Sequence, residues 1–266
     1  MPLSPLLARY DHLLLDLDGC VWVGQTPTPR APEALAEVRA AGKTISFLTN
    51  GSDVSPEDYV RKLWSLGLKA SLEEVVTVGA AIQHVLAERL PGASAFVIGS
   101  PAIFRHVADA GARVVNGTDR AAEAQVVVVA GHEDFNFREL RTATRAILAG
   151  AEMLVAGRDR TFPAEHGPVP GTGAIVAALE YATERTARSV GKPDRQLFDT
   201  ALDRLEPGPA LMVGDRLDSD LAGAAAAGLD GAIVLTGITT REQAEAASHP
   251  APVAIAENLY ALLVAG

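Results

Sequence analysis

Short apolar runs, many of them β-branched, alternate along the chain with longer stretches that have helical spacing. We predict strands at the short runs, because they are too short for helices and are bounded by turn residues. They are residues 13–15, 44–48, 75–78, 95–98, 126–130, 153–156, 210–213 and 232–235. The helical pattern covers residues 31–41, 56–66, 101–110, 137–149, 194–205 and 219–227.

This alternation of strand and helix predicts an α/β architecture with a mainly parallel sheet. The predicted strands are apolar throughout and do not alternate with polar residues, which is typical of strands buried on both faces. Serine followed by proline at Ser55–Pro56 and Ser100–Pro101 marks two helix starts, since proline suits the first helical turn. We therefore expect a doubly wound, Rossmann-like sheet.

Composition limits the class of protein. The chain has 266 residues, 48% of them hydrophobic and 21% charged, as in an ordinary globular protein of one large domain or two smaller ones. A formal charge of -10 argues against a general binder of nucleic acid or membrane surfaces. The single cysteine excludes an internal disulfide, and no apolar run reaches the ~18 residues of a membrane span. We expect a cytoplasmic protein.

Two acidic residues directly follow the first predicted strand. Asp16 and Asp18 are separated by one residue and are followed by Gly19. In a doubly wound sheet, ligands bind beyond the carboxyl ends of the strands. Carboxylates crowded there bind a cation or divide nucleophile and acid/base roles between them, although the same residues also suit a polar loop.

Two further strand ends carry groups that suit an anion. Thr49, Asn50 and Gly51 follow the second predicted strand and offer hydroxyl, amide and main-chain donors, as phosphate sites do. Lys192 follows a short apolar segment late in the chain, where its ammonium would neutralise phosphate oxygens. The alternatives are a capping turn before the helix at 56–66 and an ordinary loop lysine.

The last predicted strand–helix unit is also acidic. Gly214 and Asp215 end a buried strand, and Asp218 and Asp220 open the next helix. Acids at a helix N-terminus stabilise the helix without any metal, but Asp215 lies at the strand end itself. Phosphoryl transfer requires the groups that this sheet edge would bring together: a pair of acids, a hydroxyl, a lysine and a carboxylate that can bind a metal ion.

In these motifs the chain resembles the haloacid dehalogenase superfamily of phosphotransferases, over essentially its full length. The matching segments are Asp16–Trp22, Leu48–Ser52, Gly191–Pro193 and Gly214–Asp220, and they look most like the NagD/p-nitrophenylphosphatase branch. The resemblance implies a Rossmann-like core with a smaller α/β cap inserted into it.

The resemblance also implies a two-step, Mg²⁺-dependent phosphatase. Asp16 would attack phosphorus and form an aspartyl-phosphate, while Asp18 would protonate the leaving oxygen and then activate water. Thr49 and the backbone at Asn50 would hold the phosphoryl group, with Lys192 neutralising its charge. The implied metal ligands are Asp16, the main-chain carbonyl of Asp18, and Asp215, with Asp220 supporting the metal shell through water.

The distance in sequence between Thr49 and Lys192 indicates the insertion. They are 192 − 49 = 143 residues apart, whereas one strand–helix–strand unit needs only about 30. We expect a catalytic core formed by residues 1–82 and 187–266, and an inserted α/β cap at residues 83–186. By family analogy the cap selects the substrate and excludes water from the site.

Candidate substrate contacts in the cap follow two of its strands. They are His132, Arg158 and Asp159, with Glu165 and His166 nearby. All of these also suit exposed loops, the two histidines especially. Relatives often have Thr-Asn at the position of Ala156–Gly157, so a relative's substrate does not transfer directly to this chain.

We expect a small phosphomonoester as substrate: glycerol phosphate, a sugar phosphate, a nucleoside monophosphate or pyridoxal phosphate. Two alternatives remain, namely a phosphate-binding regulatory module without hydrolysis and a halide-removing hydrolase. Asp18 argues against both, because a sensor has no use for the acid and halide needs no protonation. Nucleic acid and membrane partners are not expected, a homodimer through the cap is possible, and Cys20 is expected to serve packing.

Overall fold

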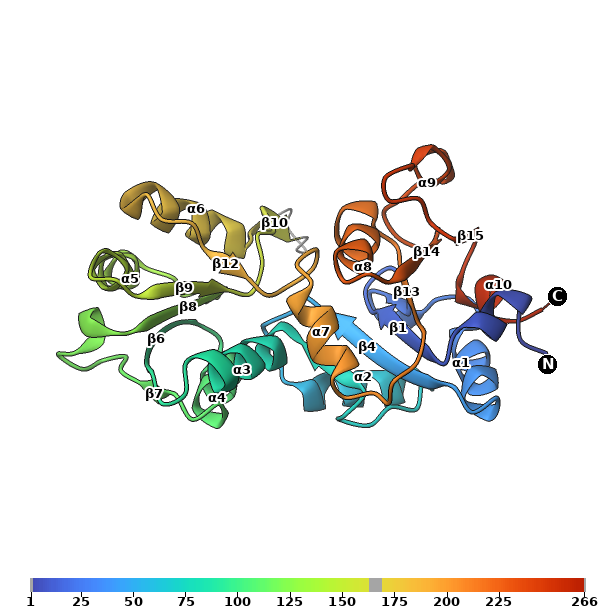
Figure 1. Cartoon of the computed structure of the whole chain (residues 1–266), viewed down its shortest axis with the longest axis horizontal. Helices are drawn as coiled ribbons and strands as arrows, with labels where there is room; N and C mark the ends of the chain where they lie inside the picture. The colour runs from blue at the N-terminus through green and yellow to red at the C-terminus, as the bar shows by residue number, and fades with distance from the viewer. Residues whose placement is uncertain (1, 163–168, 266) are drawn as a thin grey trace. The chain divides into compact units, whose positions relative to one another are not determined.

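Two units, each with its own sheet, form the described part of the chain, residues 2–162 and 169–265 of a computed structural model (Figure 1). The first unit consists of residues 1–49, 56–76 and 192–266, and the second of residues 50–55 and 77–191. The first unit is therefore discontinuous in sequence, with the second inserted into it. This arrangement confirms an α/β protein with a Rossmann-like core.

The first unit contains a six-stranded sheet in the order β15-β14-β13-β1-β4-β5. Strand β1 pairs in parallel with both β4 and β13, and its five residues are all buried. Burial on both faces explains why its sequence is apolar without alternation. The strands are β1 (His12–Asp16), β4 (Thr44–Thr49), β5 (Val75–Thr77), β13 (Ala210–Gly214), β14 (Asp230–Val234) and β15 (Ala254–Ala256).

The winding of this sheet reverses at β1. From β1 the chain proceeds outward to β4 and β5, whereas β13, β14 and β15 extend on the other side. Such a reversal is the point at which doubly wound sheets bind ligands, outside the carboxyl ends of the strands. Asp16 is the last residue of β1 and therefore lies at that point.

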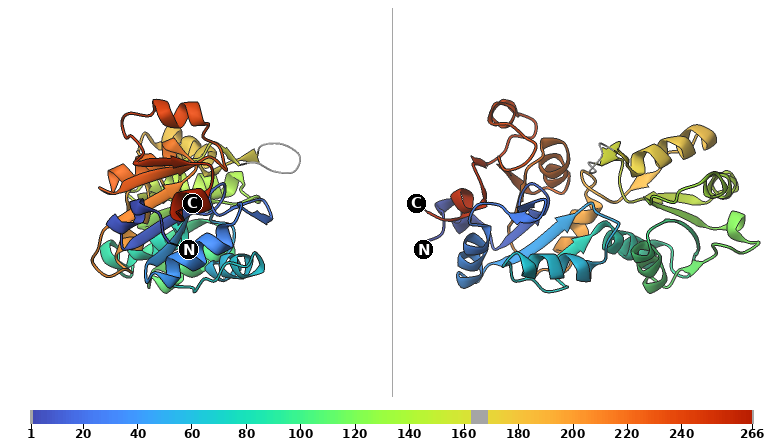
Figure 2. Two further views of the ribbon diagram at one scale, coloured as in Figure 1. Left: turned by 90° about the vertical axis from the view of Figure 1, so that its right-hand side faces the viewer. Right: turned by 180° about the vertical axis from the view of Figure 1, so that it is seen from behind.

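Short helices and a hairpin complete the first unit. Leu3 pairs with Val264, so the two ends of the described chain lie together (Figure 2). The helices are α1 (Ala31–Ala40), α2 (Pro56–Ser65), α7 (Gln196–Leu202), α8 (Ala222–Ala226), α9 (Arg241–Ala246) and α10 (Leu259–Leu263), with a 3-10 turn at Pro5–Arg9 and a π-helical turn at Leu217–Leu221. The hairpin consists of β2 (Trp22–Val23) and β3 (Thr26–Pro27).

The second unit has a five-stranded parallel sheet in the order β12-β9-β8-β6-β7. Helices α5 and α6 pack against each other, as do α3 and α4 (Figure 1). Its strands are β6 (Ser94–Gly99), β7 (Arg113–Val114), β8 (Val126–Gly131), β9 (Glu152–Val155) and β12 (Arg188–Ser189), with a hairpin of β10 (Thr161–Phe162) and β11 (Val169–Pro170). Its helices are α3 (Val78–Arg89), α4 (Pro101–Asp109), α5 (Phe137–Leu148) and α6 (Thr172–Thr183), with a 3-10 turn at Ala121–Glu123.

Helix α3 was not predicted from the sequence. Strand β5 ends at Thr77, whose side chain accepts a hydrogen bond from Ala80 N at the start of α3, so the strand predicted at 75–78 is one residue too long. Every position of α3 from Val78 to Ile82 is buried. An all-round apolar helix lacks the periodicity by which amphipathic helices are recognised.

Local contacts make the second unit wider than the expected cap of residues 83–186. Gly79 at the start of α3 lies so close to His106 on α4 that an added Cβ would be 2.3 Å from His106 Cδ2, which ties the start of α3 to this unit. Ser52 Oγ donates to Ala130 O, and Ser100 Oγ donates to Ser52 O. Ser100 thus holds residues 50–55 in place and does not cap α4 with its side chain.

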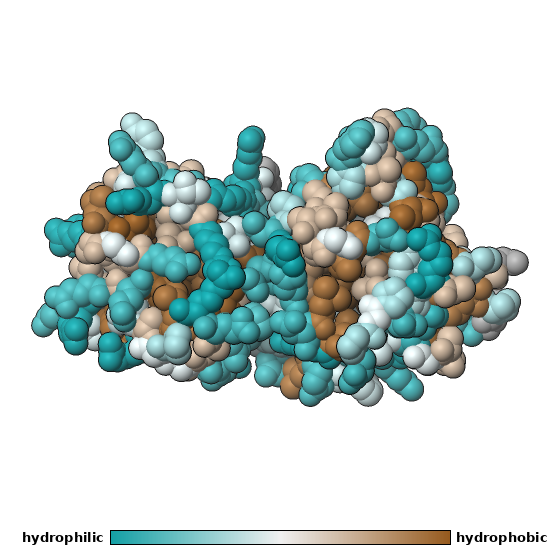
Figure 3. Space-filling model, viewed as in Figure 1, coloured by the Kyte–Doolittle hydropathy of each residue, from teal (hydrophilic) through white to brown (hydrophobic). Residues whose placement is uncertain are grey.

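No helix in residues 2–162 and 169–265 combines the length and apolar character needed to cross a membrane. On the face drawn in Figure 3, hydrophilic residues interrupt the hydrophobic ones. This surface agrees with the charged composition of the chain.

Candidate active site

Three of the residues singled out from the sequence meet at the carboxyl edge of the first sheet. Asp16 ends β1, Thr49 ends the neighbouring β4, and Asp215 follows the other neighbour, β13. All three are buried. The ends of these strands come together because parallel neighbours end on the same edge of the sheet.

Lys192 reaches the same edge from the last segment of the first unit. Its ammonium donates hydrogen bonds to Asp16 Oδ1 and to Asp220 Oδ1, the latter at 2.7 Å. Burial alone would lower the pKa of Lys192, but the Asp16 and Asp220 carboxylates outweigh it and raise the pKa above its usual value. The lysine therefore stays charged, although it is only 6% exposed.

The acids at this edge outnumber the lysine. Burial raises the pKa of Asp16 to about 8; Lys192 opposes this rise, and the charges of Asp220 and Asp215 add to it. Burial also raises the pKa of Asp215. One ammonium cannot balance three carboxylates, and a bound divalent cation would supply the missing positive charge.

The donor set fits a hard cation. Asp16, Asp215 and Asp220 each place a carboxylate oxygen within 4.8 Å of the others. Asp215 Oδ1 is buried and has no hydrogen-bond partner among the residues that the structure describes, and a bound metal ion would satisfy it. Both oxygens of Asp220 already accept hydrogen bonds, from Lys192 Nζ and from Arg216 N at 3.1 Å. This geometry suits Asp215 as a direct ligand and Asp220 as a support behind it.

A loop that the sequence did not point to positions Asp215. After β14, Ile238 N donates to Asp215 Oδ2 at 2.7 Å and Thr239 N donates to Asp215 O. Gly237 lies so close that an added Cβ would be 1.9 Å from Asp215 Oδ2. Gly19, at φ 89°, faces the same carboxylate, and its Cβ would lie 2.5 Å away. Both glycines are required by the close approach of Asp215.

Replacing Gly237 by alanine should therefore displace the Asp215 carboxylate and weaken binding of a divalent cation. Partners that orient a metal ligand are typically worth about 10- to 100-fold in affinity, so we expect a loss of that size in a calorimetric titration with Mg²⁺. Ile238→Ala is the matched control, because only its main chain binds Asp215 and its side chain is 68% exposed. Equal affinities in the two variants would contradict this role of Gly237.

Asp18 differs from its neighbour in being exposed. Its Oδ1 accepts a hydrogen bond from Trp22 Nε1 at 2.7 Å. The carboxyl group therefore lies at the accessible side of the site, where an acid/base group would meet substrate. Asn50 directly follows Thr49 and belongs to the second unit.

Cys20 is fully buried and its Sγ lies 3.5 Å from Val213 O. Burial, together with the nearby acids, raises the pKa of its thiol well above the usual value. A protonated, buried thiol is a poor nucleophile, so Cys20 contributes packing.

The residues predicted as substrate contacts make their contacts inside the second unit. His132 Nε2 lies 3.1 Å from Glu139 Oε1 on α5. The Arg158 guanidinium binds both carboxylate oxygens of Glu180 on α6, at 3.1 and 2.8 Å, and donates to Ala187 O. Their roles toward a substrate, and that of Asp159, stay predictions. Glu165 and His166 lie outside the described residues.

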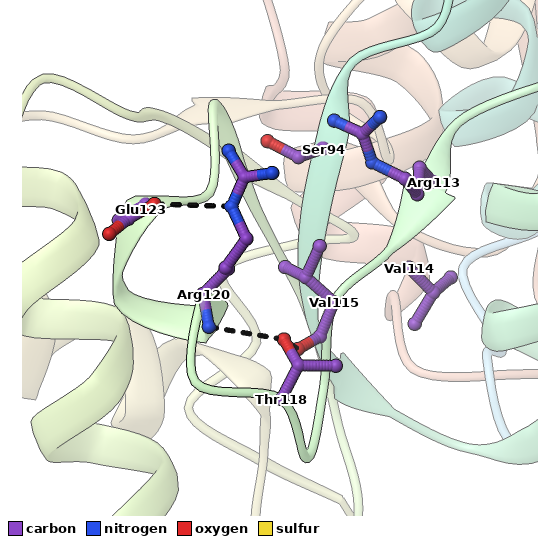
Figure 4. Close-up of a pocket in the computed structure, with 7 residues that line it drawn as sticks. All are labelled: Ser94, Arg113, Val114, Val115, Thr118, Arg120 and Glu123. Carbon is purple, nitrogen blue, oxygen red and sulfur yellow. Dashed lines mark hydrogen bonds and ion pairs between the residues drawn. The ribbon is translucent and has the colours of Figure 1, made fainter.

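A cavity of about 250 Å³ in the second unit contains none of the predicted site residues. It lies where β6 and β7 begin, and Arg120 in its wall is bound to Glu123 (Figure 4). It is lined by Ser94, Arg113, Val114, Val115, Thr118, Arg120 and Glu123. The candidate active site is thus defined by its charged groups and not by this cavity.

Comparison with known proteins identifies the motifs as those of one family. Residues 13–113 match the model of haloacid dehalogenase-like hydrolases, and residues 189–262 match a second model of this group. The chain is 38% identical to a D-glycerol 3-phosphate phosphatase of Mycobacterium tuberculosis over 90% of its length, and spans 66% of that protein. It is 36% identical to the glycerol-3-phosphate phosphatase of Gallus gallus, covering 90% of this chain and 83% of the relative.

Solved structures of phosphatases resemble this chain as well. A glycerol phosphate phosphatase of Mycobacterium tuberculosis in complex with magnesium matches with a TM-score of 0.88 and 37% identity, over 97% of this chain and 78% of that one. The p-nitrophenyl phosphatase of Archaeoglobus fulgidus matches with a TM-score of 0.87 and 32% identity, over 96% and 98% of the two chains. The likeness thus covers both units.

Proposed function

The chain belongs to the haloacid dehalogenase-like hydrolase family as a phosphatase of small phosphate esters, and we propose that it acts with Mg²⁺ through an aspartyl-phosphate on Asp16. The observation that carries this proposal is the convergence of Asp16, Lys192 and Asp215 on one buried sheet edge. A nucleophile, a fixed positive charge and an oxygen donor set for a hard cation lie there together.

In the first step, a carboxylate oxygen of Asp16 forms a bond to phosphorus as the bond to the leaving oxygen breaks. Asp18 donates its proton to that oxygen, so the product leaves as an alcohol. In the second step, Asp18, now ionised, takes a proton from water, whose oxygen attacks phosphorus and releases Asp16 and inorganic phosphate. Each acid thus returns to its starting state.

Charge neutralisation determines whether the first step occurs. Burial favours the protonated form of Asp16, which cannot attack phosphorus. The Lys192 ammonium favours the ionised form, and Mg²⁺, when held by Asp16, Asp215 and the main-chain carbonyl of Asp18, would supply further positive charge against the anionic substrate. Thr49 and the backbone at Asn50 hold the phosphoryl oxygens, and Asp220 orients Lys192.

We favour glycerol phosphate as the substrate, since two relatives carry that name. Sugar phosphates, nucleoside monophosphates and pyridoxal phosphate are the other candidates. The second unit would act as the cap that selects among them, through His132, Arg158 and Asp159. The contacts with Glu180 and Ala187 would hold the Arg158 guanidinium in place for this role.

The remaining proposals concern location, macromolecular partners and oligomeric state. We propose a cytoplasmic enzyme that binds neither nucleic acid nor membranes. A homodimer formed by the cap is supported by Phe137 on α5 and Tyr181 on α6, whose side chains are 75% and 91% exposed.

The function is tested by phosphate release from a panel of phosphomonoesters, ranked by kcat/KM. We expect glycerol 3-phosphate to rank first, activity to be lost with a chelator, and Mg²⁺ to restore it. Arg158→Ala and His132→Ala should change the ranking. Hydrolysis of p-nitrophenyl phosphate should stay largely intact, because this substrate depends little on contacts with the cap. An unchanged ranking would exclude both residues as substrate contacts.

A further inference from the structure

The indole of Trp22 is the one hydrogen-bond donor recorded for the Asp18 carboxyl group among the described residues. Trp22 Nε1 lies 2.7 Å from Asp18 Oδ1. Asp18 is exposed, whereas Trp22 is fully buried. An exposed carboxyl group otherwise changes rotamer freely, so this bond fixes an acid that solvent would leave mobile.

The backbone around the pair is also fixed. Trp22 N donates to Leu17 O at 3.1 Å, and Gly19 N donates to Trp22 O at 2.7 Å. Thr28 N donates to Val21 O at 2.9 Å, which ties the turn to the β2–β3 hairpin. Asp18 therefore lies within a closed turn whose two ends are joined by hydrogen bonds.

Helix α2 holds the Trp22 ring itself. The Tyr59 ring is stacked on it, with centroids 6.5 Å apart and planes 10° apart. The Lys62 ammonium lies 4.1 Å from the ring centroid, a favourable cation–π contact. The indole N–H is thus aimed by two residues of a helix that carries no catalytic group.

We propose that Trp22 is a positioning residue for the acid/base step, holding Asp18 Oδ1 so that its other oxygen, Oδ2, transfers the proton. The inference rests on the proposed role of Asp18. The indole nitrogen donates and does not accept hydrogen bonds, so an oxygen that receives this bond has its proton on the partner oxygen. Oδ2 is therefore the atom that protonates the leaving group and later takes a proton from water.

The experiment compares Trp22→Phe with the wild-type protein on two substrates. Phenylalanine keeps an aromatic ring beside Tyr59 and Lys62 but has no N–H. We expect kcat/KM for glycerol 3-phosphate to fall about 10- to 100-fold, a part of the roughly 10²- to 10⁴-fold that a positioned proton donor contributes. For p-nitrophenyl phosphate, whose leaving group departs without protonation, we expect a change of less than about twofold. Trp64→Phe, at a side chain 60% exposed, is the matched control.

Proton NMR of the indole groups tests the bond without turnover. The chain has two tryptophans, and Trp64→Phe assigns their signals. Asp18→Ala should move only the Trp22 signal upfield. An unmoved signal, or an equal loss of kcat/KM on both substrates in Trp22→Phe, would overturn the proposal. Full activity of Asp18→Asn on glycerol 3-phosphate would instead overturn the proposed role of Asp18 itself.

Discussion

Replacing Asp16 by asparagine should abolish phosphatase activity and leave the protein folded. The amide cannot form the aspartyl-phosphate, and removal of a nucleophile from such a site costs at least about a thousandfold in kcat. The fold should survive because the pKa of Asp16 is raised to about 8 by burial, which means that the folded protein disfavours its charge. A neutral side chain of the same shape removes that cost.

The measurement is release of p-nitrophenol with saturating Mg²⁺, together with thermal unfolding followed by circular dichroism. Asp58→Asn provides the matched control, since Asp58 is a surface acid of the same unit, paired with Arg61. We expect it to keep full activity. Turnover by Asp16→Asn at more than a few per cent of the wild-type rate would exclude Asp16 as the nucleophile.

The sequence was most informative where a strand ends. Strand β1 is buried along its whole length, so its apolar run stood out and placed Asp16 at its carboxyl end. The same holds for Thr49 after β4 and Asp215 after β13. Parallel pairing then brings these ends together, because the carboxyl ends of neighbouring parallel strands lie on the same edge of the sheet.

Elements without a distinct period were missed. Helix α3 is buried at every position of its first turn, and β15 has only three residues, too few to show alternation. The helix predicted from residue 219 begins earlier, with a π-helical turn at Leu217–Leu221. That turn brings Asp220 back toward Lys192, a departure from α-helical geometry that spacing rules do not anticipate.

Individual hydrogen bonds made by distant loops and side chains could not be predicted. The loop at Gly237 and Ile238 holds Asp215 through its backbone, and backbone donors leave no mark in residue type. Arg158 was singled out as a substrate contact, but its ion pair with Glu180, 22 residues away in sequence, was not foreseen. Periodicity gives the face of an element but not the partner of a side chain.

Replacing Lys192 by methionine should lower activity by at least about a hundredfold, the usual loss when one charge-stabilising group is removed from a transition state. Methionine fills a similar volume without the ammonium. Two effects combine, because the phosphoryl group loses a fixed positive charge and Asp16 loses the partner that favours its ionised form. The fall should therefore appear in kcat more than in KM.

The same substitution should change how stability depends on pH in the metal-free protein. Wild-type Asp16 has a folded pKa of about 8 against 3.8 in the unfolded chain. The folded state thus binds the extra proton, and stability falls as the pH rises between these values. Without Lys192 the pKa of Asp16 in the folded protein rises further. The stability of the variant therefore keeps falling above pH 8, by about 1.4 kcal/mol per pH unit. In the wild-type protein the contribution of Asp16 no longer changes in that range.

Urea unfolding at a series of pH values in the presence of a chelator measures this difference. The two proteins should have similar pH dependence below the wild-type pKa of Asp16 and diverge above it, and Mg²⁺ should reduce the divergence because a bound cation favours the ionised carboxylates. Lys69→Met, at an exposed lysine of the same unit, should follow the wild-type curve throughout. Parallel curves for Lys192→Met and wild type would mean that the ammonium does not set the charge state of Asp16, and nucleophile activation would then have to come from the metal ion alone.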